Sequence, residues 1–589
     1  MENLDEQLIN LIASEVETRE KETQSQAIIK SVLNAGVSFF HTPEGKCYSE
    51  IRNNTHLENW PITSKNFKNY LRRLFYEKYQ KPPNNQALQD ALGVLEAKAL
   101  FDAPEKEVFL RVAGDNEHIL IDMGDENWSV IEVTATGYEV KNLTHSPFRR
   151  GSGILPLPFP QEGNIELLKY FVNVEEKDFI LLVSWLLQCF NPVGSYPILV
   201  LQGEQGTAKS TTSKVLRDLI DPCTAPLRSI PREERDVWVA TIHNWVIAFD
   251  NLSGIPSWLS DALCRISTGA GSAGRTLYTD EDETTIVARR PIIVNGIDDI
   301  TSRNDFLDRS IILYLPPIPE EKRKPEAEFW KEFEIAKPKI LGALLNAVSA
   351  GLRNNIKLNR IPRMADFALW SCACCEVLPW NAEEFLDVYE GNRKGTIEQA
   401  IEFDAFSCAV RNFTVERKEW TGTAQELLDI LSPTVSEAVK RSKAWPSSPR
   451  GVSGRLRRSA TFLRQVGVEV EFSREATVNR RRLIRLSMKT TVQTVQSVQN
   501  ASTTGFLDWT VENKNEPTVQ EPSNKKVASK AILDDMDDMD GRIHSKSKGE
   551  NPDLWPTCLE CKRKVPEVNN SGLCGDCEIA ETPKKEVEI

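Results

Sequence analysis

A glycine-rich loop between a strand-like and a helix-like run has the spacing of a phosphate-binding site. The segment GEQGTAKST follows the apolar run YPILVLQ and precedes KSTTSKVLRDLI. Successive backbone N–H groups of such a loop wrap phosphate oxygens, and the N-terminus of the following helix adds a favourable dipole. The loop therefore predicts a site for a nucleoside triphosphate, with ATP as the expected ligand. The expected contacts come from Gly203, Glu204, Gln205, Gly206, Thr207, Ala208, Lys209, Ser210 and Thr211.

Three residues of this loop have distinct expected roles. Lys209 is expected to meet the β- and γ-phosphates, and Ser210 is expected to hold Mg²⁺. Ala208 stands where the pattern usually has Gly. Its methyl group is compatible with the loop if the φ angle stays negative. The alternative, an ordinary strand–turn–helix that happens to contain a lysine, is weakened by three motifs downstream.

An acidic residue ends the next buried strand, in HNWVIAFDN. At that position the carboxylate of Asp250 would join Ser210 in holding Mg²⁺. An ordinary strand-ending Asp is the alternative. The neighbour is Asn251, where many ATPases have a Glu that serves as general base, and an amide positions water but cannot accept its proton. Hydrolysis is therefore expected to be slow, or to take its base from elsewhere.

Two further motifs supply candidate catalytic side chains. The strand-like run RRPIIVNGI ends in Asn295, whose amide is expected to orient the attacking water, although Asn-Gly is also a turn signal by itself. In NDFLDRSIIL, Arg309 is the expected arginine finger, acting across a subunit boundary, and Arg303 is the competing candidate. The structural alternative for Arg309 is a salt bridge to Asp305 or Asp308.

The order of these four motifs resembles the AAA+ core of superfamily 3 helicases, and more narrowly the ATPase module of phage-, plasmid- and poxvirus-type primase-helicases. The resemblance covers about residues 196–316. The flanking segments 30–190 and 318–416 are similar to those of prophage-type ATP-binding proteins, but they contain no specific motif. The resemblance implies a ring-forming, Mg-ATP-dependent motor on single-stranded or forked DNA. We expect it to act in replication of a mobile element, with other replication proteins as possible partners.

A hairpin is expected between the second and third motifs, in GRTLYTDEDETTIVARR. In superfamily 3 relatives, a hairpin at this place enters the pore of the ring, and its basic tip grips DNA. Here the tip, residues 280–283, is acidic and would repel phosphates. Arg275, Arg289 and Arg290 at the base remain candidates for that role, and a solvated hairpin is the alternative.

A basic module follows in a chain that is acidic overall. Residues 436–489 contain 14 Lys and Arg against four Glu, whereas the whole chain has a net charge of −13. The helical run VSGRLRRSATFLRQVG and the alternating runs GVEVEF and RRLIRL look like a winged helix. Clustered cations bind DNA by releasing its counterions, and a solvated or domain-docking face is the alternative. The expected DNA contacts are Arg455, Arg457, Arg458, Arg464, Arg480, Arg481 and Arg482.

Four cysteines near the C-terminus have the spacing of a structural zinc site. Cys558 and Cys561 form one CxxC turn, and Cys574 and Cys577 form another. Each turn presents two thiolates, and two turns complete a tetrahedral Zn²⁺ site. Because the segment has little apolar sequence to bury, the metal would supply most of its folding free energy. Two redox pairs are the alternative.

The elements that must position these residues suggest a multidomain chain. Alternating runs in 107–141 predict a small antiparallel sheet, and the alternation of strands and helices after residue 196 predicts an α/β core with a parallel sheet. The expected parts are an α+β N-terminal domain that serves as a collar or binds a partner (1–160), an AAA+ core (161–316), a helical domain (317–416), a winged-helix-like module (417–488), a disordered linker (489–556) and a zinc knuckle (557–579).

Composition excludes other classes of protein. No apolar run is long enough to span a membrane, and the N-terminus has no signal-peptide pattern, so no membrane partner and a cytoplasmic location are expected. The function favoured is an ATP-dependent DNA helicase or translocase in replication of a mobile element. The alternative is an ATP-driven DNA-binding switch or loader without unwinding activity. A non-motor P-loop enzyme such as a kinase has no acceptor-site motif to support it.

Overall fold

The computed structural model describes a multidomain α/β chain. No helix among the described residues is both long and apolar enough to cross a lipid bilayer. The expected zinc knuckle and the expected linker, apart from Lys489, lie outside the residues that the structure describes. The described residues are 22–53, 56–275, 283–296, 303–358, 361–442, 445–475 and 481–489.

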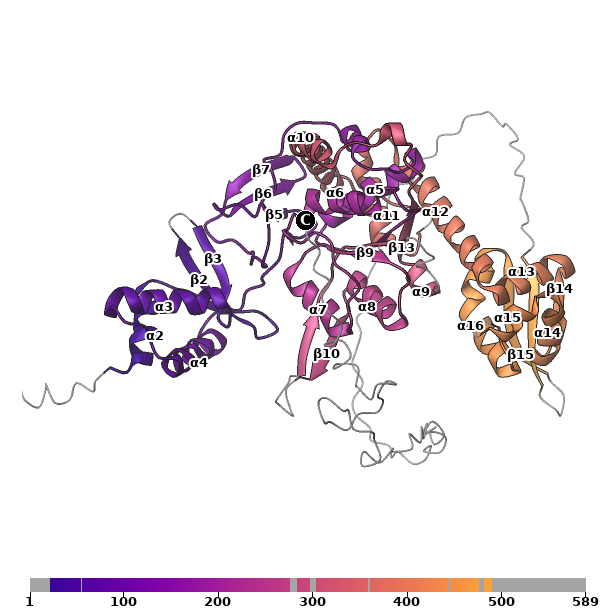
Figure 1. The fold of residues 1–589 in the computed structure, drawn as a ribbon, viewed down its shortest axis with the longest axis horizontal. Coiled ribbons are helices and arrows are strands. Elements are labelled where there is room, and N and C mark those ends of the chain that lie inside the picture. Colours follow the sequence, from indigo (N-terminus) through magenta and orange to yellow (C-terminus); the bar gives the residue numbers. More distant parts are fainter. Residues whose placement is uncertain are drawn as a thin grey trace, which may run out of the picture. The chain divides into compact units, whose positions relative to one another are not determined.

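The first part of the chain packs three helices against an antiparallel sheet with the strand order β1-β2-β3. Figure 1 shows α2, α3 and α4 beside β2 and β3. The side chains of Thr23, Ser64 and Asn84 accept hydrogen bonds from the first turns of these helices and so fix where each begins. This part has a hydrophobic core of its own. Its elements are α2 (Gln24–Asn34), β1 (Ser38–His41), β2 (Cys47–Asn53), β3 (His56–Pro61), α3 (Lys65–Tyr79) and α4 (Asn85–Phe101).

The expected sheet over residues 107–141 is confirmed as a four-stranded antiparallel meander, β4-β5-β6-β7. Its apolar face belongs to the same hydrophobic core as the α/β region after residue 160, so the core runs across the expected boundary at residue 160. The connector there is packed: Gln161 N donates to Pro338 O at 3.0 Å. A Cβ on Gly342 would lie 1.8 Å from Gln161 O, which only glycine permits. The strands are β4 (Val112–Gly114), β5 (Ile119–Asp122), β6 (Ser129–Thr134) and β7 (Gly137–Asn142).

The expected parallel sheet of the core is confirmed, with the strand order β13-β8-β12-β9. Its strands are almost entirely buried, which explains why they read as continuous apolar runs in the sequence. A separate hairpin pairs β10 with β11. The elements are η1 (Ile165–Tyr170), α5 (Glu176–Cys189), β8 (Ile198–Gln202), α6 (Lys209–Ile220), α7 (Glu234–His243), β9 (Ile247–Leu252), α8 (Ser257–Thr268), β10 (Gly271–Arg275), β11 (Glu283–Val287), β12 (Ile292–Gly296), α9 (Asn304–Leu307), β13 (Ser310–Tyr314) and η2 (Glu320–Lys322).

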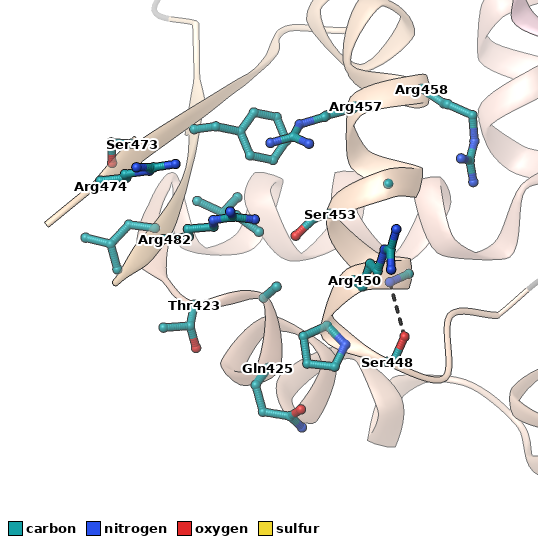
Figure 2. Close-up of a pocket in the computed structure, with 17 residues that line it drawn as sticks. Thr423, Gln425, Ser448, Arg450, Ser453, Arg457, Arg458, Ser473, Arg474 and Arg482 are labelled. Carbon is teal, nitrogen blue, oxygen red and sulfur yellow. Dashed lines mark hydrogen bonds between the residues drawn. The ribbon is translucent and has the colours of Figure 1, made fainter. Parts of the chain in front are cut away.

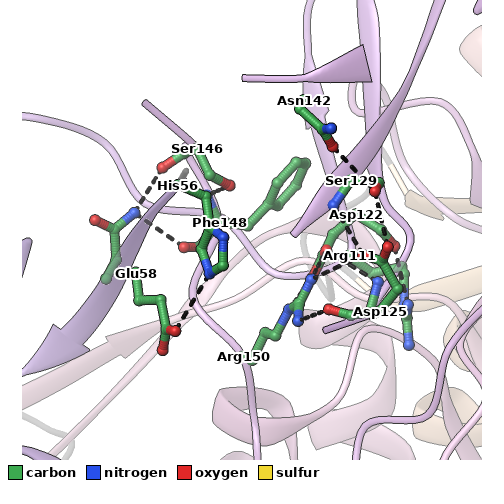
Figure 3. A network of polar contacts seen from close by, with 12 residues as sticks. His56, Glu58, Arg111, Asp122, Asp125, Ser129, Asn142, Ser146, Phe148 and Arg150 are labelled. Atoms are coloured by element: carbon green, nitrogen blue, oxygen red, sulfur yellow. Dashed lines mark hydrogen bonds and ion pairs between the residues drawn. The ribbon is translucent and has the colours of Figure 1, made fainter. Parts of the chain in front are cut away.

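A buried polar network holds the end of α6 beside the start of β9. Asp221 caps α6, and its Oδ2 accepts hydrogen bonds from the backbone N–H groups of Trp245 at 2.9 Å and Val246 at 3.1 Å. The buried guanidinium of Arg111 donates to Asp221 Oδ1 at 3.1 Å. It also donates to Asp122 O at 2.9 Å (Figure 3). Breaking such a buried pair typically costs about 3–5 kcal/mol. The network therefore fixes the positions of α6 and β9, which carry Ser210 and Asp250 of the nucleotide-site candidate.

The expected helical region is confirmed through α12, but its last helix belongs to the next module. Ile397 and Ile401 of α12 pack in the core beside the parallel sheet. By contrast, Phe406 and Phe413 of α13 pack with the C-terminal module, which moves the change of core to about residue 404. The helices are α10 (Glu326–Arg353), α11 (Ala365–Cys374), η3 (Cys375–Val377), α12 (Ala382–Phe403) and α13 (Ala405–Arg417).

The C-terminal module packs helices around a three-stranded antiparallel sheet with the order β14-β16-β15 (Figure 1). The expected helix and two strands are confirmed, and β14 and α14 are additional elements that the sequence did not reveal. The winged-helix assignment itself stays a prediction. The remaining elements are β14 (Glu419–Gly422), α14 (Ala424–Leu431), η4 (Ser432–Thr434), α15 (Glu437–Arg441), α16 (Pro449–Gln465), β15 (Val468–Arg474) and β16 (Arg482–Met488).

Candidate functional site

The glycine-rich loop lies between β8 and the N-terminus of α6, as the sequence predicts. Gly203 has φ 150° and Gly206 has φ 83°. A Cβ on Gly203 would lie 2.7 Å from Leu315 O, so a side chain there would displace the residue that follows β13. Glycine at this position therefore allows the loop to turn tightly against its neighbouring strand.

Ala208 does not meet the condition under which its methyl group was expected to fit the loop. Its φ angle is 62°, in the left-handed region, and it forms the N-cap of α6. A Cβ there lies too close to the neighbouring carbonyl oxygen, which costs about 1–2 kcal/mol for a residue other than glycine. The departure from the usual glycine therefore introduces local strain at the helix N-terminus.

Lys209 bridges the loop that it follows. Its Nζ donates to the carbonyl oxygens of Gly203 and Glu204, each at 2.7 Å. Burial lowers the pKa of Lys209 from its ordinary value, and the nearby carboxylate of Asp250 partly opposes that shift. The ammonium group thus lies over the loop, where an anion could replace the two carbonyl oxygens as its hydrogen-bond acceptor.

Ser210 and Asp250 meet although they come from different elements. Ser210 Oγ donates to Asp250 Oδ1 at 2.6 Å. A hydroxyl and a carboxylate are hard oxygen donors, the kind that Mg²⁺ prefers, and Mg²⁺ usually takes only one or two carboxylates together with water and phosphate oxygens. The donor set therefore fits Mg²⁺ held between α6 and the end of β9.

Asn295 is brought to the same place, but its amide is engaged. The side chain is 1% exposed on β12. Its Oδ1 accepts from Asn251 N at 2.9 Å, and its Nδ2 donates to Ser213 Oγ at 2.9 Å. Asn251 itself has φ 57° and an exposed side chain. Asn295 thus joins α6 to β9 and shapes the turn at Asn251, while its expected contact with water stays a prediction.

Two residues beside the glycine-rich loop were missed from the sequence because they come from distant segments. Asn173 Nδ2 donates to Thr207 O at 3.1 Å and to Pro316 O at 2.6 Å, so it ties the glycine-rich loop to the segment after β13. Arg323 is exposed, and its Nη2 lies 3.9 Å from the point that a Cβ on Gly206 would occupy. Its position within the motif-free run EEKRKPEAE gave no signal.

Both candidate arginine fingers are paired within the chain. Arg309 forms an ion pair with Asp305, and Arg303 pairs with Asp261 at 2.7 Å. Arg309 Nη1 also donates to the backbone oxygen of Asp305 at 3.0 Å. The structure thus shows the salt-bridge alternative for Arg309. Arg309 can act as an arginine finger only if its ion pair with Asp305 opens.

The two arginines at the base of the hairpin that are described with side chains are held by the core. Arg289 donates to Pro192 O at 2.6 Å. Arg290 donates to Thr241 O at 3.1 Å, and its guanidinium lies 5.2 Å from the centre of the Trp245 ring. Burial lowers the pKa of Arg290 to about 10. These contacts favour a packing role. Residues 280–282 of the acidic tip lie outside the described residues, as do the side chains of Glu283 and Arg275.

The arginines of the C-terminal module divide into paired and unpaired sets. Arg455 pairs with Asp404 at 3.1 Å, and Arg464 pairs with Glu469 at 3.6 Å, so two of the expected DNA contacts are neutralised within the chain. Arg481 is exposed, whereas Arg480 lies outside the described residues. The other expected contacts, Arg457, Arg458 and Arg482, line a groove together with Arg450 and Arg474, which the sequence pattern did not reveal (Figure 2).

The four cysteines of the expected zinc site, Cys558, Cys561, Cys574 and Cys577, lie outside the described residues. Within the part of the chain that is described, no group of three or more His, Cys, Asp or Glu side chains is arranged to hold a metal ion. Zinc therefore stays a prediction from the cysteine spacing.

Two family models match adjacent regions of the chain. Residues 165–389 match the actinomycete integrative conjugative element replication protein, RepA, and residues 406–502 match the C-terminal domain of the same RepA proteins. The second match begins where the structure places the change of core near residue 404. The chain therefore has both regions of a mobile-element replication protein, and the expectation of a role in such replication is confirmed.

Comparisons with curated proteins and with solved structures do not extend this assignment. No curated protein matches the chain. Among solved structures, it resembles the apo structure of the NrS-1 C-terminal region (305–718), with a TM-score of 0.37 and 14% identity over 80% of this chain and 100% of that chain. The A form apo structure of the same region gives a TM-score of 0.35 and 14% identity over 78% and 98%. Likeness at this level carries no argument about function.

Proposed function

We propose that this mobile-element replication protein is an ATP-dependent DNA helicase or translocase that hydrolyses ATP at the loop 203–211. The observation that carries the proposal is the contact between Ser210 and Asp250, at 2.6 Å, directly beside Lys209. A lysine and a hydroxyl from a strand–loop–helix unit, with a carboxylate from another strand of the same sheet, are the parts that phosphoryl transfer needs, because its catalysis is mostly positioning and charge neutralisation.

In the proposed site, the backbone N–H groups of the loop and the N-terminus of α6 bind the phosphates. Lys209 exchanges the carbonyl oxygens of Gly203 and Glu204 for phosphate oxygens. Ser210 and Asp250 would hold Mg²⁺, which when bound neutralises phosphate charge. Asn295 and Asn173 keep α6, β9 and the loop in register by their hydrogen bonds to Asn251 and Thr207.

We further propose that Arg323 binds the γ-phosphate side of the nucleotide within the same subunit. Its guanidinium lies beside Gly206 and is exposed, and no ion pair joins it to another described residue. A guanidinium offers a planar fork of donors that matches phosphate oxygens. Arg309 would act from the neighbouring subunit of a homo-oligomeric ring, after its pair with Asp305 opens.

A second function is favoured by one observation: no carboxylate follows Asp250. The exposed Asn251 occupies the place of the usual general base and cannot accept the proton of the attacking water. A site of this kind suits an ATP-driven switch or loader that binds DNA, with weak turnover and no unwinding.

Turnover and unwinding separate the two functions. Purified full-length protein is expected to hydrolyse ATP with Mg²⁺, to do so faster with DNA, and to unwind a forked substrate. Lys209→Ala and Ser210→Ala should each lower turnover about 100-fold or more, because each removes a stabilising contact to the transferring phosphoryl group. Lys214→Ala, a half-exposed lysine on the same helix, is the matched control.

The outcomes are distinct. ATP binding and DNA binding without strand separation would support the switch and reject the motor. Full ATPase activity in Lys209→Ala would reject both functions.

The zinc proposal is tested separately by metal analysis of the purified chain. One zinc per chain that is lost on Cys558→Ser with Cys574→Ser would support a four-thiolate site. A metal-free chain with two disulfides would reject it.

A further inference from the structure

We propose that a groove in the C-terminal module binds the phosphate backbone of double-stranded DNA, and that it does so without nucleotide. The groove has a volume of about 1330 Å³ and lies between α16, the start of α14 and the β15–β16 hairpin. We call it the arginine groove and define it by Arg450, Arg457, Arg458, Arg474, Arg482 and Phe472.

The charge of the arginine groove is uncompensated. All five arginines are exposed, and no ion pair joins any of them to another described residue. No carboxylate is among the described residues that line it. Figure 2 shows Arg450, Arg457, Arg474 and Arg482 around one space, with Arg458 on another flank of α16. A concave wall with charge of one sign concentrates ions of the opposite sign.

Two of these arginines are held together by the sheet. Arg474 on β15 and Arg482 on β16 are directly opposite each other in the antiparallel register. Residues opposite each other project from the same face, and two like charges in this arrangement repel. A phosphate between them would turn the repulsion into two favourable contacts, because a guanidinium donates bidentate hydrogen bonds to phosphate oxygens.

The start of α16 adds to the positive potential. The groove wall includes Ser448, the N-cap of this 17-residue helix, and Arg450 in its first turn. Unpaired N–H groups and the helix dipole at an N-terminus attract anions. Acidic side chains, which usually occupy the first turn of a helix, are missing from this one.

The lining favours a duplex over a single strand. Proteins that bind single strands without sequence preference stack the bases on free aromatic rings. Among the described residues that line the arginine groove, Phe472 is the one with an aromatic side chain, and the guanidinium of Arg457 covers it, 4.8 Å from the centre of the ring. Guanidinium groups without a stacking platform suit the regular phosphates of a duplex.

The C-terminal module also has arginines that do not line the groove. Arg455, Arg464 and Arg485 belong to the same module but pair with acidic side chains outside the groove. If a basic surface of any kind were enough, these arginines should contribute as much as those of the groove. The structure assigns binding to the unpaired set alone.

The test measures binding of the full-length chain to a labelled duplex of about two helical turns by fluorescence anisotropy, without nucleotide, over a range of salt concentrations. The logarithm of the binding constant falls linearly with the logarithm of the salt concentration. Removing one arginine that neutralises a phosphate should lower the magnitude of this negative slope by about 0.9. Arg474→Gln with Arg482→Gln should therefore lower it by about two, and Arg450→Gln, on another wall, by about one. Arg464→Gln, on the same helix but paired with Glu469, is the matched control and should leave the slope unchanged.

The expected result includes equal affinity for two unrelated duplex sequences and undiminished binding in Lys209→Ala. This separates failure of the inference from failure of the ATPase proposal. The inference is overturned if the groove variants keep the parental slope, or if a single strand of the same length binds more tightly than the duplex. A strong preference for one duplex sequence would also overturn it, because backbone contacts carry no sequence information.

Discussion

Ser210 on α6 donates a hydrogen bond to Asp250 on β9, although β9 and the strand that leads into α6 are not neighbours in the sheet. β12 lies between β8, which leads into α6, and β9. Asn295 at the end of β12 fills the position between them and bonds to both sides, through Ser213 and Asn251. The strand order therefore explains why the motif that comes third along the chain lies between the first two in space.

Replacing Ala208 with glycine is expected to stabilise the α/β core by about 0.5–1 kcal/mol. The left-handed φ of 62° costs an alanine about 1–2 kcal/mol, which exceeds the cost of about 0.4–1 kcal/mol that glycine adds through the unfolded chain. The measurement is the midpoint of the thermal transition that ATP shifts. Gly206→Ala, at φ 83°, is the mirror experiment and should lower that midpoint. The strain argument fails if both variants move it in the same direction.

Replacing Asn295 with alanine is expected to destabilise the core by about 1–3 kcal/mol, because it removes the acceptor of the Asn251 N–H and the amide that donates to Ser213 Oγ. Denaturant unfolding measures the change. Asn251→Gly is the control, since it keeps the left-handed backbone and removes only an exposed side chain. An Asn295→Ala protein with parental stability but no turnover would instead favour the water-orienting role.

Removing the Arg309 guanidinium is expected to abolish turnover in the assembled protein, and activity should return on mixing two inactive variants. In a mixed ring, a Lys209→Ala subunit supplies Arg309 to the intact phosphate loop of an Arg309→Ala neighbour. A steady-state ATPase assay of the mixture, with native mass measurement, tests this. Mixing Lys209→Ala with Ser210→Ala should restore nothing. Full activity of Arg309→Ala as a monomer would exclude the finger.

Arg323→Ala is expected to weaken ATP binding more than ADP binding, because the guanidinium is proposed to meet the terminal phosphate. Removal of one charge-assisted hydrogen bond typically costs about 1.5–3 kcal/mol, which corresponds to an affinity change of tenfold or more. Lys322→Ala, its exposed neighbour, is the matched control. Equal weakening of ATP and ADP would place Arg323 away from the terminal phosphate.

The stability of the core is expected to fall as pH rises through about 6, because of Asp178. Burial raises the pKa of Asp178 to about 6, Glu175 adds to the rise, and a hydrogen bond from the Tyr314 backbone opposes it. Since the unfolded carboxyl titrates near about 3.9, the folded state binds more protons between these values and loses stability as pH increases.

Asp178→Asn should therefore raise the free energy of unfolding by about 1 kcal/mol above pH 7, a value reduced for the partial exposure of the carboxyl, and by nothing near pH 4. Unfolding measured at both pH values checks this. A gain of equal size at both would show that the charge of Asp178 is not the cause.

Local chemistry in the sequence was enough for the loop, the parallel strands and the ends of the strands that carry Asp250 and Asn295. Apolar runs without alternation identify strands buried on both faces, and the carboxyl ends of parallel strands must meet at one edge of their sheet. The residues of the nucleotide-site candidate could therefore be named before their positions were known.

Tertiary structure decided which charges are free and which are paired. Arg457 and Arg464 lie on the same helix and look alike in sequence, yet Arg464 meets Glu469 and Arg457 faces the groove. The backbone angle of Ala208 and the approach of Arg323 to Gly206 likewise depend on segments far along the chain. Residue type fixes the chemistry that a side chain can do, but its neighbours across the fold determine whether that capacity is already used.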